Sequence, residues 1–154
     1  MKKRVVAWFS CGAASAVAAR LAFDKWGTTH DVEAVYCDTS VDEHPDNARF
    51  LADVSRWIER PITVIRSRRF SGIESVFAKK RYMSGVKGAP CTVELKKIPR
   101  FQFQRGDDIN IFGFTSDEQS RIEAFENRNP ELELRWPLKE DGITKRDCYR
   151  ILTA

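Results

Sequence analysis

The sequence predicts an α/β fold of the doubly wound, Rossmann-like type, formed by a single domain over residues 1–154. Short apolar runs of strand length alternate with longer amphipathic or alanine-rich segments from the N-terminus onward. No internal repeat, low-complexity tract or linker marks a domain boundary within the 154 residues. Because parallel strands need helical crossovers between them, this alternation calls for a mainly parallel sheet with helices on both faces.

Five β-branched, aliphatic or aromatic segments have the composition and length of strands. They are Arg4–Phe9, Val32–Cys37, Ile62–Ile65, Asp108–Phe114 and Leu132–Trp136. Pro61 directly precedes the third segment, and the fourth carries Ile109, Ile111 and Phe112. We therefore expect a five-stranded sheet.

The remaining periodic segments have apolar residues at helical spacing. They are Ala13–Trp26, Asp46–Glu59, Ile73–Tyr82, Val93–Phe103, Asp117–Asn127 and Thr144–Leu152. We expect Pro99 to kink or break the fourth helix, because proline lacks an N–H and clashes with the preceding turn. Thr144 is expected to cap the last helix. The Gly, Ser and Pro content of residues 84–90 predicts a loop.

Composition excludes several classes of protein. With 42% hydrophobic and 31% charged residues, the chain is that of a folded globular domain. Its longest apolar run is far shorter than the roughly 20 residues that span a bilayer. Residues 1–4, with basic residues at 2–4, resemble the start of a signal peptide. Cleavage after the next apolar run would destroy the motif at residues 10–15, so we expect a cytoplasmic protein. Four widely spaced cysteines without a CxxC pair argue against a zinc ribbon and a disulfide framework.

Positive charge is concentrated in the middle of the chain. Residues 66–105 contain eleven Lys and Arg against two Glu, which gives this stretch a net charge of +9. Because the whole chain has a net charge of +4, the remaining residues carry −5. This segregation indicates an anionic partner, either nucleotide phosphates, sulfate or a nucleic-acid backbone. The alternative is a basic helix that is merely solvated.

The residues that follow each strand are the first candidates for a site, because ligands of such sheets bind beyond the carboxyl ends of the strands. The first strand is followed by Ser10, Cys11, Gly12, Ala13, Ala14 and Ser15. A turn of small residues that leads into a helix directs backbone N–H groups and the positive end of the helix dipole toward an anion. The hydroxyls of Ser10 and Ser15 can add donors. The segment is neither a Walker A motif nor GxGxxG, and small residues also allow a helix to pack close to a strand.

Polar clusters also follow the second and fourth strands. The further candidates are Asp38 and Thr39, then Cys91 and Lys96 in the basic stretch, and then Gly113, Asp117, Glu118 and Arg121. An aspartate followed by hydroxyls can bind ribose, base or metal. The alternatives are that Asp46 caps the second helix and that Asp117 and Glu118 are acids placed favourably in a first helical turn.

In this order, the motifs resemble the phosphoadenosine-phosphosulfate (PAPS) reductase family of the PP-loop, adenine-nucleotide α-hydrolase-like superfamily. Residues 10–15 stand where the family has SGGxDS, and residues 38–46 resemble its DTG…xPET segment. Residues 91–99 resemble CxxxxKxxP, residues 113–121 resemble GxRxDES.R, and residues 136–144 resemble the closing PL…W(T) element. The resemblance implies a HUP-type sheet with strand order 3-2-1-4-5.

The resemblance further implies an enzyme that binds ATP or PAPS, with phosphates at residues 10–15 and adenine or ribose near Asp38 and Thr39. Lys96 would neutralise phosphate or sulfate charge, and Cys91 would be a nucleophile or sulfur carrier. The implied reaction is nucleotide-dependent activation, or sulfur or adenylyl transfer. Ala14 replaces the family's aspartate, so Mg²⁺ would be held mainly through nucleotide phosphates. The cysteine pairs that hold an iron–sulfur cluster in some relatives are missing, so no cluster is expected.

Two alternative functions stay open. A PAPS or APS reductase-like activity would need Cys91 or a partner thiol, because no ECGLH-like segment with the family's nucleophile is present. A non-catalytic module would bind nucleotide or nucleic acid through the basic stretch of residues 66–105, whose interleaved aromatic residues could stack on bases. Cys11, Ala14 and Thr115 depart from the family's pattern. The oligomeric state is left open, and no membrane partner is expected.

The cysteines give one further expectation. The predicted fold brings Cys11, Cys37 and Cys91 to the same edge of the sheet, where helix N-termini and lysines would lower the pKa of a thiol. The alternative is that Cys11 and Cys37 are small buried apolar residues. Cys148 lies within an amphipathic helix and is expected in the core.

Overall fold

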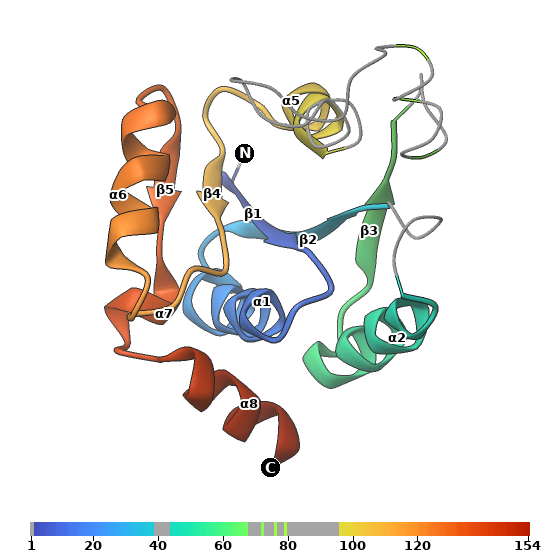
Figure 1. Ribbon diagram of the computed structural model, residues 1–154. Helices are drawn as coiled ribbons and strands as arrows, with labels where there is room; N and C mark the ends of the chain where they lie inside the picture. The colour runs from blue at the N-terminus through green and yellow to red at the C-terminus, as the bar shows by residue number, and fades with distance from the viewer. Residues whose placement is uncertain (1, 39–43, 68–71, 73–75, 77–78, 80–95) are drawn as a thin grey trace.

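The computed structural model describes residues 2–38, 44–67, 72, 76, 79 and 96–154, and its centre is a five-stranded parallel sheet (Figure 1). The strands are β1 (Arg4–Phe9), β2 (Asp31–Cys37), β3 (Ile62–Ile65), β4 (Ile109–Ile111) and β5 (Glu133–Arg135). All neighbouring strands are parallel, and their order is β3-β2-β1-β4-β5. The predicted fold class and strand order are confirmed. Strand order reverses between β1 and β4.

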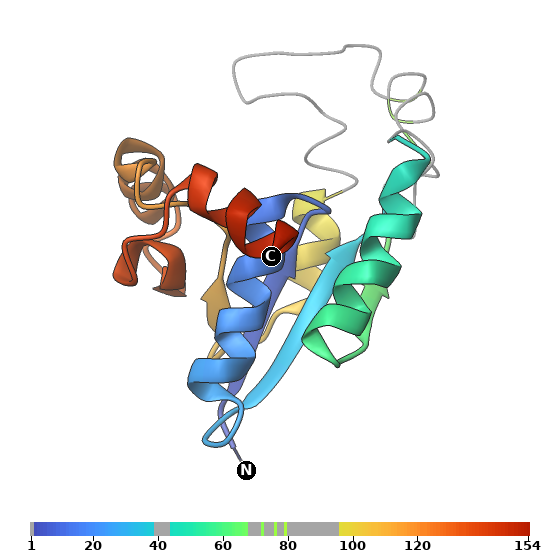
Figure 2. The same cartoon turned by 90° about the horizontal axis from the view of Figure 1, so that it is seen from below.

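Helices cover both faces of this sheet. The described helices are α1 (Ala13–Trp26), α2 (Asp46–Ile58), α5 (Ile98–Phe103), α6 (Gln119–Arg128), α7 (Pro137–Glu140) and α8 (Lys145–Thr153). Figures 1 and 2 show α1, α2 and α8 on one face and α5 on the other. Helix α6 lies beside β5, where the Trp136 indole donates to a carboxylate oxygen of Glu126 at 2.9 Å. None of the described helices is long and apolar enough to cross a membrane.

The central strand β1 is buried along its whole length, as expected for a strand covered on both faces. Val5, Ala7 and Phe9 belong to the core cluster formed with α1, α2 and α8. Val6 and Trp8 point to the opposite face, where Phe103 of α5 packs against them. Ala16, Ala18, Ala19 and Ala22 of α1 let this helix lie close to the sheet, and they are almost entirely buried.

Several element boundaries differ from those predicted. Strands β4 and β5 are shorter than expected because the chain leaves the ladder after Ile111 and Arg135. Pro99 does not kink α5: it lies in the first turn of the helix, where its missing N–H has no partner to lose. The one-turn helix α7 begins at Pro137 and was missed, although the same rule could have placed it. The predicted helix over 73–82, apart from residues 76 and 79, and the loop over 84–90 lie outside the described residues, as do residues 93–95 of the next predicted helix.

Candidate functional site

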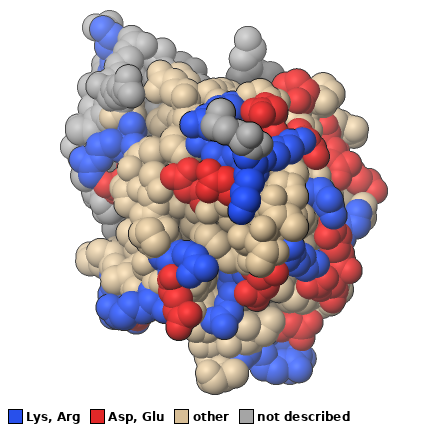
Figure 3. Space-filling view, turned by 180° about the vertical axis from the view of Figure 1, so that it is seen from behind, with Lys and Arg blue, Asp and Glu red and all other residues tan. Residues whose placement is uncertain are grey.

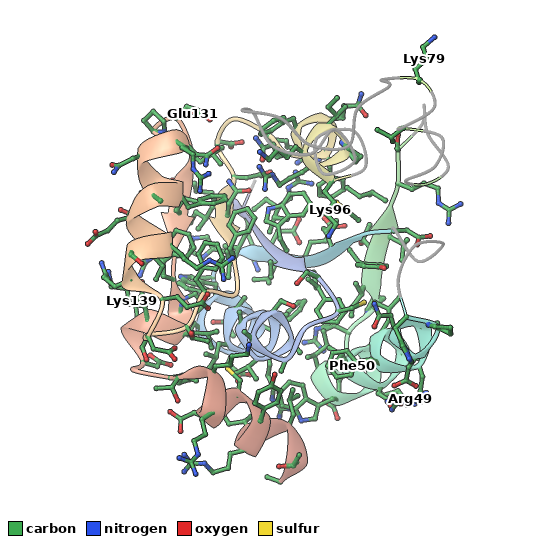
Figure 4. All side chains as sticks on the ribbon, in the orientation of Figure 1. Arg49, Phe50, Lys79, Lys96, Glu131 and Lys139 are labelled. Atoms are coloured by element: carbon green, nitrogen blue, oxygen red, sulfur yellow. The ribbon has the colours of Figure 1, made fainter. Side chains whose placement is uncertain are left out.

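A cleft with a volume of about 470 Å³ lies at the carboxyl ends of β1, β2 and β4. This size is within the range of roughly 300–1,000 Å³ typical of small-molecule sites. The cleft spans the point where strand order reverses, which is where doubly wound sheets bind their ligands. Its walls belong to both layers of the molecule, because α1 and α8 contribute residues from one face and α5 from the other. Figure 4 shows Lys96 between α5 and strands β1 and β2.

Most of the site residues predicted from the sequence meet in this cleft. Those that line it are Ser10, Gly12, Ala13, Ser15, Lys96, Gly113, Glu118 and Arg121. Cys11, Asp38 and Asp117 lie in the same segments but do not line the cleft. Thr39 and Cys91 lie outside the described residues.

The loop over residues 10–15 is held in shape by Ser15. The buried Ser15 hydroxyl donates to the Gly12 carbonyl at 3.0 Å and accepts from the Ser10 amide at 3.1 Å. The exposed Ser10 hydroxyl lies 3.2 Å from the same Ser15 oxygen. Ser15 therefore stabilises the turn with its hydroxyl, whereas the hydroxyl of Ser10 is placed to reach a ligand.

The N-terminus of α1 opens onto the cleft without a capping side chain. Its N-cap is Gly12, no side chain in the described part of the chain caps its first amides, and no acidic residue lies in its first turn. The first N–H groups of a helix have no partner within the helix and carry the positive end of its dipole. This 14-residue helix therefore presents donors and partial positive charge to the cleft.

Cys11, in the loop that leads into α1, has a backbone conformation that favours glycine. Its φ of 60° lies in the left-handed region, which glycine enters without the steric cost that a Cβ brings. The Cys11 thiol lies 3.9 Å from the Asn47 carbonyl of α2. The side chain therefore faces α2 rather than the cleft.

Gly113 has a packing role in the floor of the cleft. A Cβ at this position would lie 2.6 Å from both the backbone nitrogen and the Cα of Ser15. The chain after β4 thus passes directly against the first turn of α1. Any residue other than glycine at position 113 would force the two backbone segments apart. This contact brings the ends of β1 and β4 together under the cleft.

Cationic side chains dominate the polar lining of the cleft. Lys96, Arg100, Arg121 and Lys145 line it, against the single carboxylate of Glu118 among the described residues. Elsewhere the charges are mixed: on the face seen in Figure 3, Lys and Arg side chains alternate with Asp and Glu. The cleft is therefore a place of positive potential that favours an anionic ligand.

Glu118 and Asp117 are engaged in the turn that precedes α6. The buried Thr115 hydroxyl contacts the carboxylates of both, at 3.0 Å for Glu118, and Arg121 donates to Glu118 at 2.5 Å. Burial by itself would raise the pKa of Glu118, but the Thr115 amide and hydroxyl and the Arg121 guanidinium outweigh it and lower that pKa. The hydrogen bond from Thr115 also lowers the pKa of Asp117. Both acids remain ionised and shape the turn.

Asp38 also has a partner within the protein. Its carboxylate accepts from Arg66, which follows β3, and its amide donates to the Ile65 carbonyl at 2.6 Å. Asp38 is therefore paired with Arg66 and is not among the residues that line the cleft, and its predicted contact with ribose stays a prediction.

Sequence reasoning missed several residues of the cleft. Trp8, Phe112 and Phe114 form apolar parts of its wall. The two phenylalanines flank Gly113 directly after β4, a position that could have singled them out. Lys145 and Tyr149 reach the cleft only because α8 packs on α1, and nothing local in the sequence indicates this.

The expectation of a lowered thiol pKa is wrong for Cys37. Burial raises the pKa of Cys37 to about 11, although the positive charges of Arg100 and Lys96 act in the opposite direction. Its thiol lies 3.8 Å from the Lys96 carbonyl. Cys148 is fully buried in the core, as predicted. In the described part of the chain, no group of three His, Cys, Asp or Glu side chains could hold a metal ion.

Fold and site together define a Rossmann-like α/β domain with a cationic cleft at its topological switch point. In comparisons with known proteins, no family model matches the chain, and no curated protein matches it.

Proposed function

We propose that this cleft binds an adenine nucleotide, with phosphates against the loop of residues 10–15 and the N-terminus of α1. The observation that carries the proposal is the uncapped N-terminus of a 14-residue helix that opens onto a cleft lined by four cationic side chains. A phosphate chain is the ligand group that such a helix end favours, because it accepts from several N–H groups at once. The motif resemblance supports adenine as the base.

The apolar wall is suited to the nucleoside part of the ligand. Trp8, Phe112 and Phe114 offer ring surfaces beside the cationic floor, and Tyr149 closes the α8 side. Small-molecule sites commonly combine such apolar walls with a few fixed polar groups.

The proposed reaction is nucleotide-dependent activation or transfer, in which the cationic side chains stabilise negative charge that develops on the phosphates. Such preorganised electrostatic stabilisation is worth roughly 3–4 kcal/mol for one well-placed donor. Neither Cys37 nor Glu118 suits a general base, because Cys37 stays protonated at neutral pH and Glu118 is held by Thr115 and Arg121. Any accompanying Mg²⁺ would be coordinated mainly by the nucleotide phosphates and water.

The test is a titration of the protein with ATP, AMP and PAPS, in which calorimetry and amide NMR detect binding. Gly12→Val should abolish binding, because its side chain would block the approach of a phosphate to the backbone. The fold should tolerate a Cβ here, since φ is −107° and the Cβ would make only ordinary contacts of 3.8 and 3.9 Å to the Ser10 and Ser15 oxygens. If none of the three nucleotides perturbs the amides of residues 10–15, the proposal is wrong.

Two further measurements separate the open alternatives. Turnover of ATP or PAPS by the bound complex distinguishes an enzyme from a binding module. The salt dependence of affinity distinguishes a nucleotide from a nucleic acid, because several backbone phosphate contacts give a steep slope.

A further inference from the structure

Arg100 is a partly buried cation without an acidic partner. No carboxylate in the described part of the chain lies within ion-pairing distance of its guanidinium, unlike Arg4, Arg49 or Arg121, each of which pairs with an acid. Its Nε is buried and has no hydrogen-bond partner among the residues that the structure describes. Burial lowers the pKa of Arg100, which reflects the cost of holding this charge away from water.

Aromatic rings hold the guanidinium in place. Its central carbon lies 5.1 Å from the ring centroid of Phe101, 5.3 Å from that of Phe112 and 5.8 Å from that of Phe125. Rings attract a cation through their faces but offer no acceptor to its N–H groups. The side chain is thus fixed on its apolar sides, and its Nε lacks an acceptor among the described residues beside the cleft that it lines.

We infer that Arg100 is the recognition residue for an oxyanion of the cleft ligand, a phosphate or sulfate group, which supplies the missing acceptor. The inference deepens the proposed nucleotide-binding function and rests on it for the identity of the ligand as a nucleotide. A guanidinium presents a planar fork of donors that matches two oxygens of such a group. The cleft is therefore expected to select ligands with a second anionic group beyond the one held at the N-terminus of α1.

A purely structural role of Arg100 and a role in ligand binding predict different stabilities for the free protein when Arg100 is replaced. An arginine kept for stability would be paired, and its replacement by an apolar side chain of similar length would destabilise the fold. An unpaired buried charge destabilises the free protein instead, so Arg100→Met should unfold at the same temperature as the wild type or at a higher one.

The experiment compares the wild type, Arg100→Met and the matched control Arg105→Met. Arg105 belongs to the same basic stretch, is exposed, and lines a different cavity at the amino ends of the strands together with Lys2, Arg4 and Arg60. Thermal unfolding is measured with and without inorganic pyrophosphate, and affinities are measured for adenosine, AMP, ATP and adenosine 3′,5′-bisphosphate.

We expect Arg100→Met to weaken the binding of ATP, of the bisphosphate or of both by about tenfold or more. Adenosine should bind both variants equally, and Arg105→Met should behave as wild type.

The pattern of loss identifies the oxyanion. A loss for ATP alone assigns Arg100 to the 5′-phosphate chain, and a loss for the bisphosphate alone assigns it to a 3′-phosphate. If nucleotides bind the wild type and Arg100→Met equally, or if Arg100→Met unfolds at a clearly lower temperature with unchanged affinities, the inference is wrong while the proposed function stands. If no nucleotide binds but pyrophosphate stabilises the wild type and not Arg100→Met, the proposed function is wrong while the oxyanion role of Arg100 stands. Absence of any effect of pyrophosphate and of all nucleotides overturns both.

Discussion

Arg4 and Asp108 form a two-pronged ion pair at the amino ends of β1 and β4, the edge of the sheet opposite the cleft. The Arg4 Nε lies 2.9 Å from one carboxylate oxygen and a terminal nitrogen lies 2.6 Å from the other. Both residues are buried, and the same carboxylate accepts the Arg105 amide at 2.7 Å. Asp108 also raises the pKa of Arg4, chiefly through this hydrogen bond, against the opposing effect of burial. The pair joins two neighbouring strands whose opposite ends carry the site.

Asp108→Asn should destabilise the protein by about 3 kcal/mol, because the buried Arg4 then keeps only the more distant carboxylate of Glu33, at 3.6 Å, as a counter-charge. The free energy of unfolding in urea measures this loss. Glu133→Gln is the control: it breaks the exposed Lys3–Glu133 pair at 2.5 Å, which should change stability by no more than about 1 kcal/mol. Equal effects of the two substitutions would show that burial does not set the strength of the pair.

Gly113→Ala should destabilise the protein by about 1–3 kcal/mol, as overpacking typically does. Its added carbon would collide with the backbone of Ser15, so the end of β4 and α1 must move apart. Gly106→Ala is the matched control, since nothing lies within 4 Å of a Cβ there. Amide shifts in residues 10–15 for the first variant but not the second would confirm that Gly113 sets the shape of the cleft floor.

Cys11→Gly should be more stable than Cys11→Ala by about 1 kcal/mol, because φ is positive at this position. Both variants lose the thiol that faces Asn47, so the loss of that contact cancels when the two are compared. Urea unfolding of the two variants side by side is the measurement. If the alanine variant is the more stable one, the left-handed conformation of residue 11 is not maintained in solution.

The free energy of unfolding should fall as pH rises from about 9 toward 11. Burial raises the pKa values of Cys37 and Cys148 from 9.0 to about 11, so the folded state favours the neutral thiols. That contribution is complete below the thiol pKa of the unfolded chain and is lost as pH rises through the folded-state value. Cys148→Ala should therefore show a shallower decline than the wild type between pH 9 and 11. Between pH 6 and 8 the two proteins should show parallel profiles.

Local sequence signals were sufficient for the framework of the fold. The runs over β1, α1 and β3 predicted their bounds, and Thr144 caps α8 as expected, accepting from the Asp147 amide at 3.2 Å. These elements are specified by residues that lie next to one another in the chain. Apolar alternation and turn chemistry are therefore enough to define them.

The composition of the cleft depends on contacts that sequence patterns do not contain. The position of Asp38 after a strand predicts a ligand-binding acid, but no local pattern indicates that Arg66, which follows the neighbouring strand β3, pairs with its carboxylate. The sequence presents Arg100 as one charge in a basic stretch, and only the folded structure shows that it lies among rings, with no described carboxylate paired to it. Lys145 reaches the cleft because its helix α8 packs on α1, which lies more than a hundred residues earlier in the chain.

The position of the cleft across the edge of the sheet has a mechanical consequence. Its walls come from α1 on one face and α5 on the other, two layers that the strands otherwise separate. A ligand that contacts both walls would connect the two helix layers. Local unfolding of either helix would then require that the ligand dissociate. Hydrogen exchange in α1 and α5 should slow together when a ligand occupies the cleft. Occupancy of the site would thus determine how often these two helices unfold locally.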